Sequence, residues 1–417
     1  MRAWLTLAHR YVGLVLAGFL FVAGLTGAAL AWNHELDAAI NAGMMKAAPP
    51  SPDAPAIDPL QIRERIAARD PEAQVNWMDL SPAAGEARLF LLTWPDAARE
   101  NADNEVYADP YTGAVLGSRR WGNIRQGMVN LMPFLYRLHH SLALGTIGTY
   151  AFGIVALLWK LDCFVGAWLT MPARFRRTGS APDRQPRKRW TARWWPAWKV
   201  RWHGGATKLN VDLHRAGGLW PWAMLFVLAW SSVGFNLKEV YQPVMHRLFE
   251  RQNELAQRQP LPAPQAKPGM SWFEAREIGR DLIAREAQQN GVAILEERGL
   301  SYEPARALFR YRVLSDRDVT LRWGVTSMYF DANDGRRIAA HLPTGKAAGD
   351  TVDHWLSVLH MAAVWGAPFQ AFITLLGFGV AMLSVTGLVI WQKKRQARHA
   401  RSGLIDRSVH HRQKPAS

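Results

Sequence analysis

Four of the thirteen histidines stand near the ends of long apolar stretches, where imidazole nitrogens could bind a metal: His9, His139, His214 and His360. Zinc normally needs four ligands, and no carboxylate or thiolate recurs beside these histidines. Haem iron needs only two axial ligands, and a porphyrin suits an apolar pocket between helices. The chain has one cysteine and no Cys-x-x-Cys-His sequence, so any haem would be non-covalent and b-type. The alternative is that each histidine only bonds a neighbouring helix.

An internal repeat gives these histidines equivalent positions. The segment 138–169 aligns without a gap to 359–390, which matches His139 with His360. The segments that begin at His9 and His214 match in the same way. Each half of the chain therefore reads as a span, an outer domain and a second span.

Four stretches are long enough to cross a bilayer, which takes about 20 apolar residues. They cover residues 11–32, 142–171, 216–237 and 361–391. The first could be a signal peptide, but its apolar run is too long for a usual one and it has a partner later in the chain. We expect a membrane α-helical fold with four transmembrane helices in two tandem repeats.

The charges indicate how the spans are oriented. Two segments are strongly basic: 172–215 has 12 Lys or Arg and 2 Asp or Glu, and 392–417 has 8 and 1. The two long segments between spans are close to balanced: 34–136 has 9 basic and 14 acidic residues, and 238–360 has 17 and 16. The positive-inside rule places both termini and the basic loop in the cytoplasm. Because this side holds the whole excess of +16, the basic residues are topology signals and lipid contacts, and nucleic acid is not an expected partner.

These observations predict eight consecutive parts. The membrane parts are 1–35, 134–172, 213–237 and 353–392, and two extracytoplasmic α+β domains cover 36–133 and 238–352. A Trp-rich basic loop, 173–212, and a basic tail, 393–417, complete the chain. The loop reads as an interfacial anchor, with a docking surface for a cytoplasmic electron donor as the alternative.

The outer segments contain recognisable elements. Helical spacing marks 57–70 and 272–290, the latter with Ser271 as its expected N-cap. Segments 88–94, 305–313 and 321–330 read as strands. Asp109 and Asp331 begin Asp- and Gly-containing segments that suit hairpin turns.

The predicted topology sorts the histidines into two pairs, His9 with His214 at the cytoplasmic ends of their spans and His139 with His360 at the outer ends. Nearby glycines would let a flat ring approach the backbone: Gly13, Gly18, Gly24, Gly145, Gly148, Gly217, Gly218 and Gly366. Lys160 and Asp162 are the only charges inside a span. We expect Lys160 to contact a haem propionate or a polar neighbour, unless it snorkels to the interface.

The chain resembles the PepSY-associated transmembrane proteins over nearly its whole length. The resemblance rests on His9-Arg10-x-x-Gly13, Leu138-His139-x-Ser141-Leu142, Leu213-His214-Arg215-x-x-Gly218, Leu359-His360, Thr386-Gly387 and the Tyr-x-Asp-x-x-x-Gly turns. It implies four spans, PepSY-like outer domains, and two b-type haems held by His9, His214, His139 and His360. Characterised members similar to this chain are inner-membrane ferric-siderophore reductases, so the implied activity is electron transfer from the cytoplasmic side to a periplasmic ferric chelate in iron uptake.

Some features depart from this pattern. His140 adjoins His139, and His34 and His354 lie near outer span ends, so each of the three is a further candidate ligand. No dinucleotide-binding sequence follows a strand, so a separate cytoplasmic reductase or a quinol would donate the electrons. Two other functions remain open: a non-enzymatic protein that binds a periplasmic partner or the siderophore, and a quinol-linked haem protein that serves another acceptor.

Overall fold

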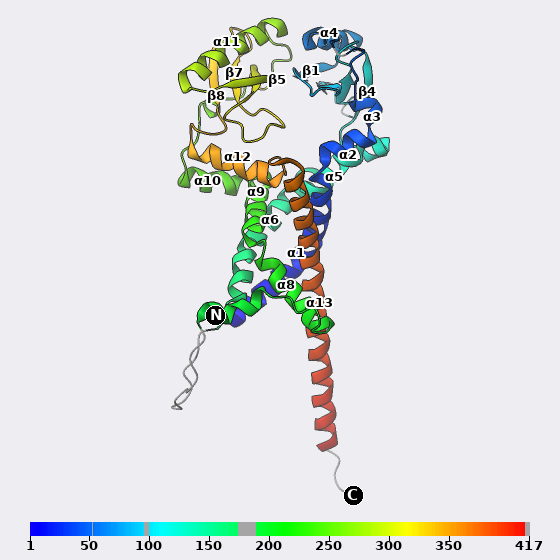
Figure 1. The fold of residues 1–417 in the computed structure, drawn as a ribbon, viewed down its shortest axis with the longest axis vertical. Helices are drawn as coiled ribbons and strands as arrows, with labels where there is room; N and C mark the ends of the chain where they lie inside the picture. The colour runs from blue at the N-terminus through cyan, green and yellow to red at the C-terminus, as the bar shows by residue number, and fades with distance from the viewer. Residues whose placement is uncertain (52, 96–98, 100, 174–188, 413–417) are drawn as a thin grey trace. The chain divides into compact units, whose positions relative to one another are not determined.

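The computed structural model describes the whole chain except residues 52, 96–98, 100, 174–188 and 413–417. The chain forms two compact units. The helical unit contains Met1–Ala29, Leu138–Lys238 and Ala371–Ser417, and the sheet unit contains Leu30–Arg137 and Glu239–Gln370 (Figure 1). Much of the predicted basic loop, and the end of the predicted tail, lie outside the described residues.

Three helices of the helical unit are long and apolar enough to cross a membrane. They are α1 (Arg2–Leu30), α6 (Gly145–Thr170) and α13 (Gly366–Arg412, apolar in its first part). The helices α8 (Ala206–Leu219) and α9 (Trp222–Asn236) pass the same test together, but they meet at a bend of 67°. The chain therefore has three candidate spans in its described residues, or four if the bent pair is one span.

The bend corrects the predicted third span. We expected a continuous helix over 216–237, but α8 ends at Leu219 and Pro221 follows before α9 begins. Proline lacks an N–H and its ring clashes with the preceding turn, so a helix breaks there.

The second and fourth predicted spans also begin later than expected. The short helix α5 (Leu131–Ser141) ends before α6, and α12 (Ala348–His360) ends before α13. Residues in the left-handed region mark both breaks, among them Gly145 (φ 60°) and Gly366 (φ 61°). Glycine adopts this conformation without strain, which explains the two glycines at the start of α6 and α13.

Close glycine contacts join α1 to α13. A Cβ on Gly24 would stand 2.6 Å from the carbonyl oxygen of Gly377, and a Cβ on Gly377 would stand 2.5 Å from that of Gly24. Small residues let helix backbones approach in a membrane, where van der Waals packing drives association.

The sheet unit is built on one eight-stranded antiparallel sheet in the order β4-β3-β2-β1-β5-β6-β7-β8. Its strands are β1 (Gln74–Asp79), β2 (Arg88–Thr93), β3 (Glu105–Ala108), β4 (Val115–Arg119), β5 (Ile294–Glu303), β6 (Leu308–Ser315), β7 (Ser327–Asp331) and β8 (Arg337–His341). Each half of the sheet is a run of four sequential strands. The two predicted outer segments thus share one sheet and do not fold as separate domains.

The seam between the halves is the pairing of β1 with β5, where Trp77 lies opposite Ser301 and Asp79 opposite Gly299. An exposed edge strand leaves unpaired N–H and C=O groups. Pairing these two edges satisfies both rows of groups, which is why the halves join.

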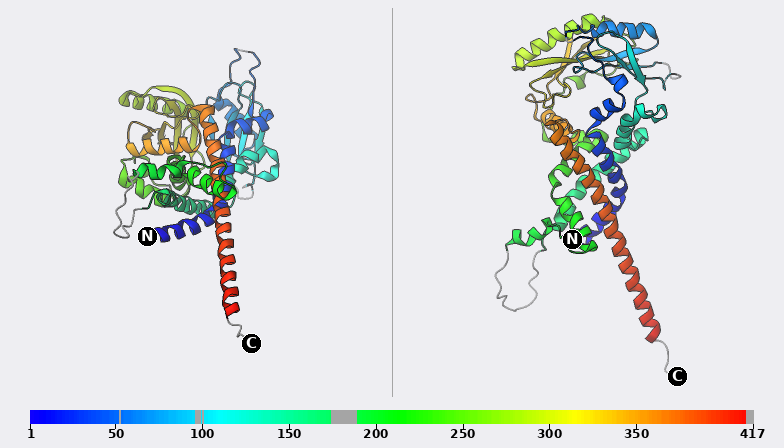
Figure 2. Two further views of the ribbon diagram at one scale, coloured as in Figure 1. Left: turned by 60° about the horizontal axis from the view of Figure 1, so that its bottom comes forward. Right: turned by 45° about the vertical axis from the view of Figure 1, so that its right-hand side comes forward.

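Two helices cover one face of this sheet, α4 (Pro59–Arg69) from the first half and α11 (Trp272–Asn290) from the second (Figure 2). Their apolar side chains share one core with strand residues such as Phe90, Phe309 and Phe330. The predicted cap of α11 is confirmed, because the Ser271 side chain accepts from the Glu274 N–H. Asp58 caps α4 in the same way.

The chain also contains four shorter helices: α2 (Asn33–Ile40), α3 (Ala42–Met45), α7 (Trp190–Trp194) and α10 (Lys238–Leu248).

The sequence analysis did not predict five of the strands, namely β1, β3, β4, β5 and β8. The predicted strand 321–330 was partly wrong, since β7 begins only at Ser327. The hairpin prediction is confirmed at both turns. Asp109 accepts from the Tyr111 N–H, and Asp331 from the Asn333 N–H.

A charged cluster ties α11 to β5 and makes a testable pH dependence. Burial alone would raise the pKa of Glu297, but hydrogen bonds from Arg280, Arg276 and Tyr311 outweigh it and lower the pKa to about 2. A depressed carboxyl pKa stabilises the fold above the unfolded value, and this contribution is lost as pH falls through the folded one. We therefore expect the thermal midpoint of the sheet unit to fall as the pH drops from about 4.5 to about 2, and Glu297→Gln to flatten that fall. An equal slope in wild type and variant would contradict the assignment.

Candidate functional site

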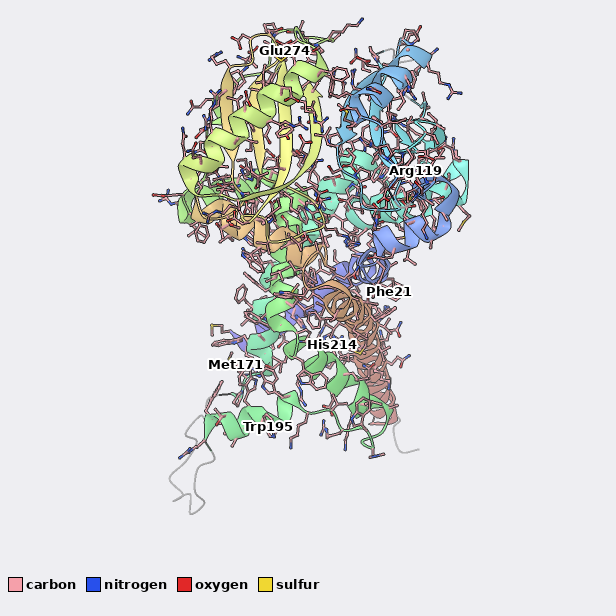
Figure 3. All side chains as sticks on the ribbon, turned by 45° about the horizontal axis from the view of Figure 1, so that its top comes forward. Phe21, Arg119, Met171, Trp195, His214 and Glu274 are labelled. Carbon is pink, nitrogen blue, oxygen red and sulfur yellow. The ribbon has the colours of Figure 1, made fainter. Side chains whose placement is uncertain are left out.

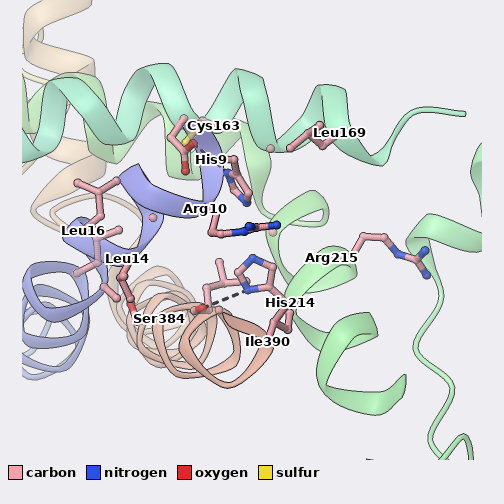
Figure 4. Close-up of a pocket in the computed structure, with 18 of the residues that line it drawn as sticks. His9, Arg10, Leu14, Leu16, Cys163, Leu169, His214, Arg215, Ser384 and Ile390 are labelled. Carbon is pink, nitrogen blue, oxygen red and sulfur yellow. Dashed lines mark hydrogen bonds and ion pairs between the residues drawn. The ribbon is translucent and has the colours of Figure 1, made fainter. Parts of the chain in front are cut away.

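A cavity of about 540 Å³ lies within the helical unit. Residues of α1, α6, α8, α9 and α13 line it, most of them apolar. His9 enters it from α1 and His214 from α8 (Figure 4). The structure therefore brings together the two histidines that the repeat predicted as a pair, although they are 205 positions apart in the sequence.

The imidazoles of His9 and His214 are spaced to share a metal. Their ring centroids are 6.1 Å apart, and the rings are inclined at 60°. Two imidazoles bound through nitrogen to opposite sides of one ion, at about 2 Å each, would have centroids about 6 Å apart. The inclination is free to vary, because each ring can rotate about its bond to the metal.

Hydrogen bonds fix which nitrogen of each ring carries the proton. His9 Nδ1 lies 2.9 Å from the Asp162 carboxylate, and His214 Nδ1 lies 3.2 Å from the Leu383 carbonyl oxygen. Both partners only accept, so each neutral ring is protonated at Nδ1 and its Nε2 has a lone pair available. Metal-binding histidines are typically oriented in this way.

Thr386 supports the same tautomer of His214. Its Oγ1 lies 3.0 Å from Nδ1 and donates its own proton to the Met382 carbonyl, so it can accept from the ring. Within the described residues, Nε2 of His9 and of His214 has no hydrogen-bond partner.

A glycine stands against each ring. A Cβ on Gly166 would lie 3.4 Å from His9 Cε1, and a Cβ on Gly387 would lie 3.2 Å from His214 Cε1. These two glycines occupy matching positions of the predicted repeat. A Cβ at Gly387 would be in tight contact with the His214 imidazole, whereas a Cβ at Gly166 would just reach ordinary contact with that of His9.

His139 has the same surroundings at another place in the helical unit. Its Nδ1 lies 3.0 Å from Thr26 Oγ1, whose own proton goes to the Val22 carbonyl. A Cβ on Gly27 would stand 3.0 Å from His139 Cε1. At His9, His139 and His214 alike, a glycine lies against the ring and Nδ1 has a hydrogen-bond partner. Helix packing alone does not require this combination at all three histidines.

The remaining candidate histidines differ. His360 is the last residue of α12, in the sheet unit. His354 accepts at Nε2 from the Val319 N–H, and His34 donates from Nε2 to the Glu86 carboxylate, 2.7 Å away, so both already have protein partners at that nitrogen. The His140 carbonyl oxygen accepts from Asn236.

The two charges within α6 have different surroundings. Lys160 Nζ lies 3.2 Å from the centroid of the Trp230 ring and does not line the cavity, so it stabilises α6 against α9 through a cation–π contact. Asp162 lines the cavity and bonds to His9. The sequence interpretation missed this partnership, although Asp162 precedes Gly166 by one helical turn and so shares its face.

Several glycines that were expected to let a flat ring approach the backbone have other contacts. Of the eight glycines predicted to admit a flat ring, Gly13 and Gly218 line the cavity. Gly24 instead contacts α13, and a Cβ on Gly217 would meet Met382.

In the Trp-rich loop, Trp194 donates from Nε1 to Thr170 at the end of α6. Trp195, in the same loop, is exposed (Figure 3).

The long apolar helices of the helical unit indicate a membrane protein. The chain belongs to the family of the PepSY-associated TM region, whose model matches residues 6–394. No curated protein matches the chain. Within the described residues, no group of three or more His, Cys, Asp or Glu side chains could hold a metal ion.

Proposed function

We propose that this protein is a b-type haem electron-transfer protein of the bacterial inner membrane that reduces a periplasmic ferric chelate during iron uptake. Both termini would lie in the cytoplasm, as the distribution of basic residues predicts. The observation that carries the proposal is the facing pair His9 and His214, 6.1 Å apart in an apolar cavity.

The residues around the cavity fit a haem. The two imidazoles, with unprotonated Nε2 atoms, would hold its iron, and Gly166 and Gly387 leave room beside the rings. Arg10 and Lys394 also line the cavity. Their charges would pair with the two carboxylates of a porphyrin, a favourable interaction in an apolar setting.

The outer pair of ligands would be His139 and His360, as the resemblance implies. Support at His139 comes from its contacts with Thr26 and Gly27, which repeat those of His214 with Thr386 and Gly387. The protein would then hold two haems, one toward each face of the membrane.

When bound, haem would supply a one-electron carrier. The protein's own groups orient the ligands, and Asp162 holds a proton at His9 Nδ1 with a carboxylate acceptor. Most of the residues that line the cavity are apolar. One electron converts each Fe(III) of the chelate to Fe(II), and a quinol or a cytoplasmic reductase is the donor.

An absorption spectrum of the detergent-purified protein tests the proposal. We expect a Soret band and, after dithionite, the sharp visible bands of reduced b-type haem, which a ferric chelate then reoxidises. A folded but colourless protein would overturn the proposal and favour a non-enzymatic binding function. Reduced haem that an added ferric chelate leaves unoxidised would favour a different acceptor.

Gly387 offers a variant that perturbs one ligand without removing it. A Cβ there would stand 3.2 Å from His214 Cε1, so Gly387→Val should tilt the ring. We expect a displaced reduction potential and weaker haem retention, measured by redox titration and by haem-to-protein ratio. Gly379→Val is the matched control on the same helix, since a Cβ at Gly379 meets nothing within 4 Å. Identical potentials for both variants would contradict the contact.

A further inference from the structure

The sheet face opposite α4 and α11 carries two rows of cross-strand neighbours. One row runs Trp77, Ser301, Arg310 and Tyr329 across β1, β5, β6 and β7. The other runs Gly299, Arg312, Ser327 and His341 across β5 to β8. Side chains alternate between the faces of a strand, and the intervening residues fill the core beneath the helices. We call these two rows the basic face.

The two arginines of the basic face have donor capacity to spare. Arg312 lies 5.3 Å from the Trp77 ring centroid and makes no hydrogen bond or ion pair within the described part of the chain. Arg310 donates from Nε to Ser327 and lies 5.4 Å from the Tyr329 ring centroid. Both arginines and both aromatic side chains are partly exposed.

The electrostatic surroundings favour an anion. Burial and the neighbouring Arg310 lower the pKa of Arg312 to about 10, and the opposing effect of Asp79 does not outweigh them. A half-buried, unpaired charge is costly, and a bound anion would offset that cost. Gly299 lies beneath the pair, where a Cβ would stand 3.2 Å from Arg312 Nη2 and 3.4 Å from Trp77 Nε1.

No acidic group forms an ion pair with Arg310 or Arg312 within the described residues, although the charge of Asp79 acts on Arg312. Burial raises the pKa of Asp79, which lies opposite Gly299 on β1. Asp318 uses its oxygens to accept from Ser315, Val325 and Thr326. Burial also lowers the pKa of His341, which favours its neutral form.

We propose that the basic face binds the ferric chelate itself, and that this chelate is anionic and aromatic, of the tris-catecholate class. The guanidinium groups would pair with the negatively charged catecholate oxygens, and Trp77 and Tyr329 would stack on the flat rings. A neutral hydroxamate chelate offers neither charge nor rings. This inference rests on the proposed function, because it names the substrate of that reaction.

Titration calorimetry with gallium(III) chelates tests the inference, because gallium is not reduced and binding needs no haem. The full-length protein is titrated with a tris-catecholate complex and with a neutral tris-hydroxamate complex. We expect the catecholate complex to bind at least tenfold more tightly, and Arg312→Gln to weaken it about 10- to 100-fold. Arg336→Gln removes an equal charge from an exposed residue after the β7–β8 turn and should leave binding unchanged.

Arg310→Gln is a second variant in case Arg312→Gln does not fold, and it should weaken binding in the same direction. Equal affinity for the two gallium complexes would overturn the inference, as would unchanged catecholate binding in both arginine variants. Loss of binding in Arg336→Gln would also count against it. The haem spectrum is recorded on the same samples. A normal haem spectrum without chelate binding would contradict this inference alone. Chelate binding by a protein without haem would contradict the proposed function alone.

Discussion

If the protein holds two haems as proposed, replacing His214 by alanine is expected to remove about half of the haem absorbance, because one of the two proposed bis-histidine sites would lose a ligand. His9→Ala should do the same, since His9 and His214 face each other across 6.1 Å. The measurement is the haem-to-protein ratio of detergent-purified protein by absorbance of the reduced form. Combining His214→Ala with His139→Ala should leave no haem.

The matched control for this prediction is His203→Ala. His203 is exposed, lies 11 positions before His214 and does not line the cavity, so its loss should leave the haem content unchanged. Full haem retention in both His9→Ala and His214→Ala would refute the ligand assignment. Loss in all three variants would instead indicate a general folding defect.

Replacing Arg119 by methionine is expected to cost about 3–5 kcal/mol of stability, since breaking a buried ion pair leaves its partners as uncompensated charges. Arg119 is 3% exposed, on β4 of the sheet unit (Figure 3). It donates to Asp37 at 2.8 Å, to Glu105 at 2.7 Å and to the Val129 carbonyl at 2.8 Å. The thermal midpoint of the sheet unit should fall on the order of 10 °C.

Two comparisons separate the ion pairs from the loss of side-chain bulk. Arg120→Met changes the adjacent residue, whose side chain makes no hydrogen bond within the described chain, and should have little effect. A triple variant with Arg119, Asp37 and Glu105 all replaced by apolar residues should be more stable than Arg119→Met alone, because no charge is then left unpaired. A triple variant less stable than Arg119→Met would contradict this explanation.

The sequence was a good guide wherever local chemistry decides structure. Ser271 as the cap of α11 and Asp109 as a turn residue follow from side chains that bond their own backbone. The apolar stretches that became α1, α6 and α13 follow from the length needed to cross a bilayer. The pairing of His9 with His214 was predicted from their equivalent positions, and both do line one cavity.

The sequence was a poor guide to breaks and strand pairing. The helix break at Pro221 lies inside an uncharged run, so hydropathy did not reveal it, although the proline itself was a local signal for a break. Strands such as β3 and β4 are only four and five residues long, and short strands depend on neighbours far along the chain.

By itself, the sequence determined which residue types stand at the ends of the apolar helices, how the charges are distributed and where the repeats match, because these are properties of the chain in order. Only the tertiary structure decided that β1 pairs with β5 in one sheet and that Asp162 bonds His9 from a different helix. It also placed Trp77 in register with Arg310 of β6, through Ser301 of β5. Such contacts join residues more than 150 positions apart, and a local pattern carries no record of which distant backbone will supply the partner.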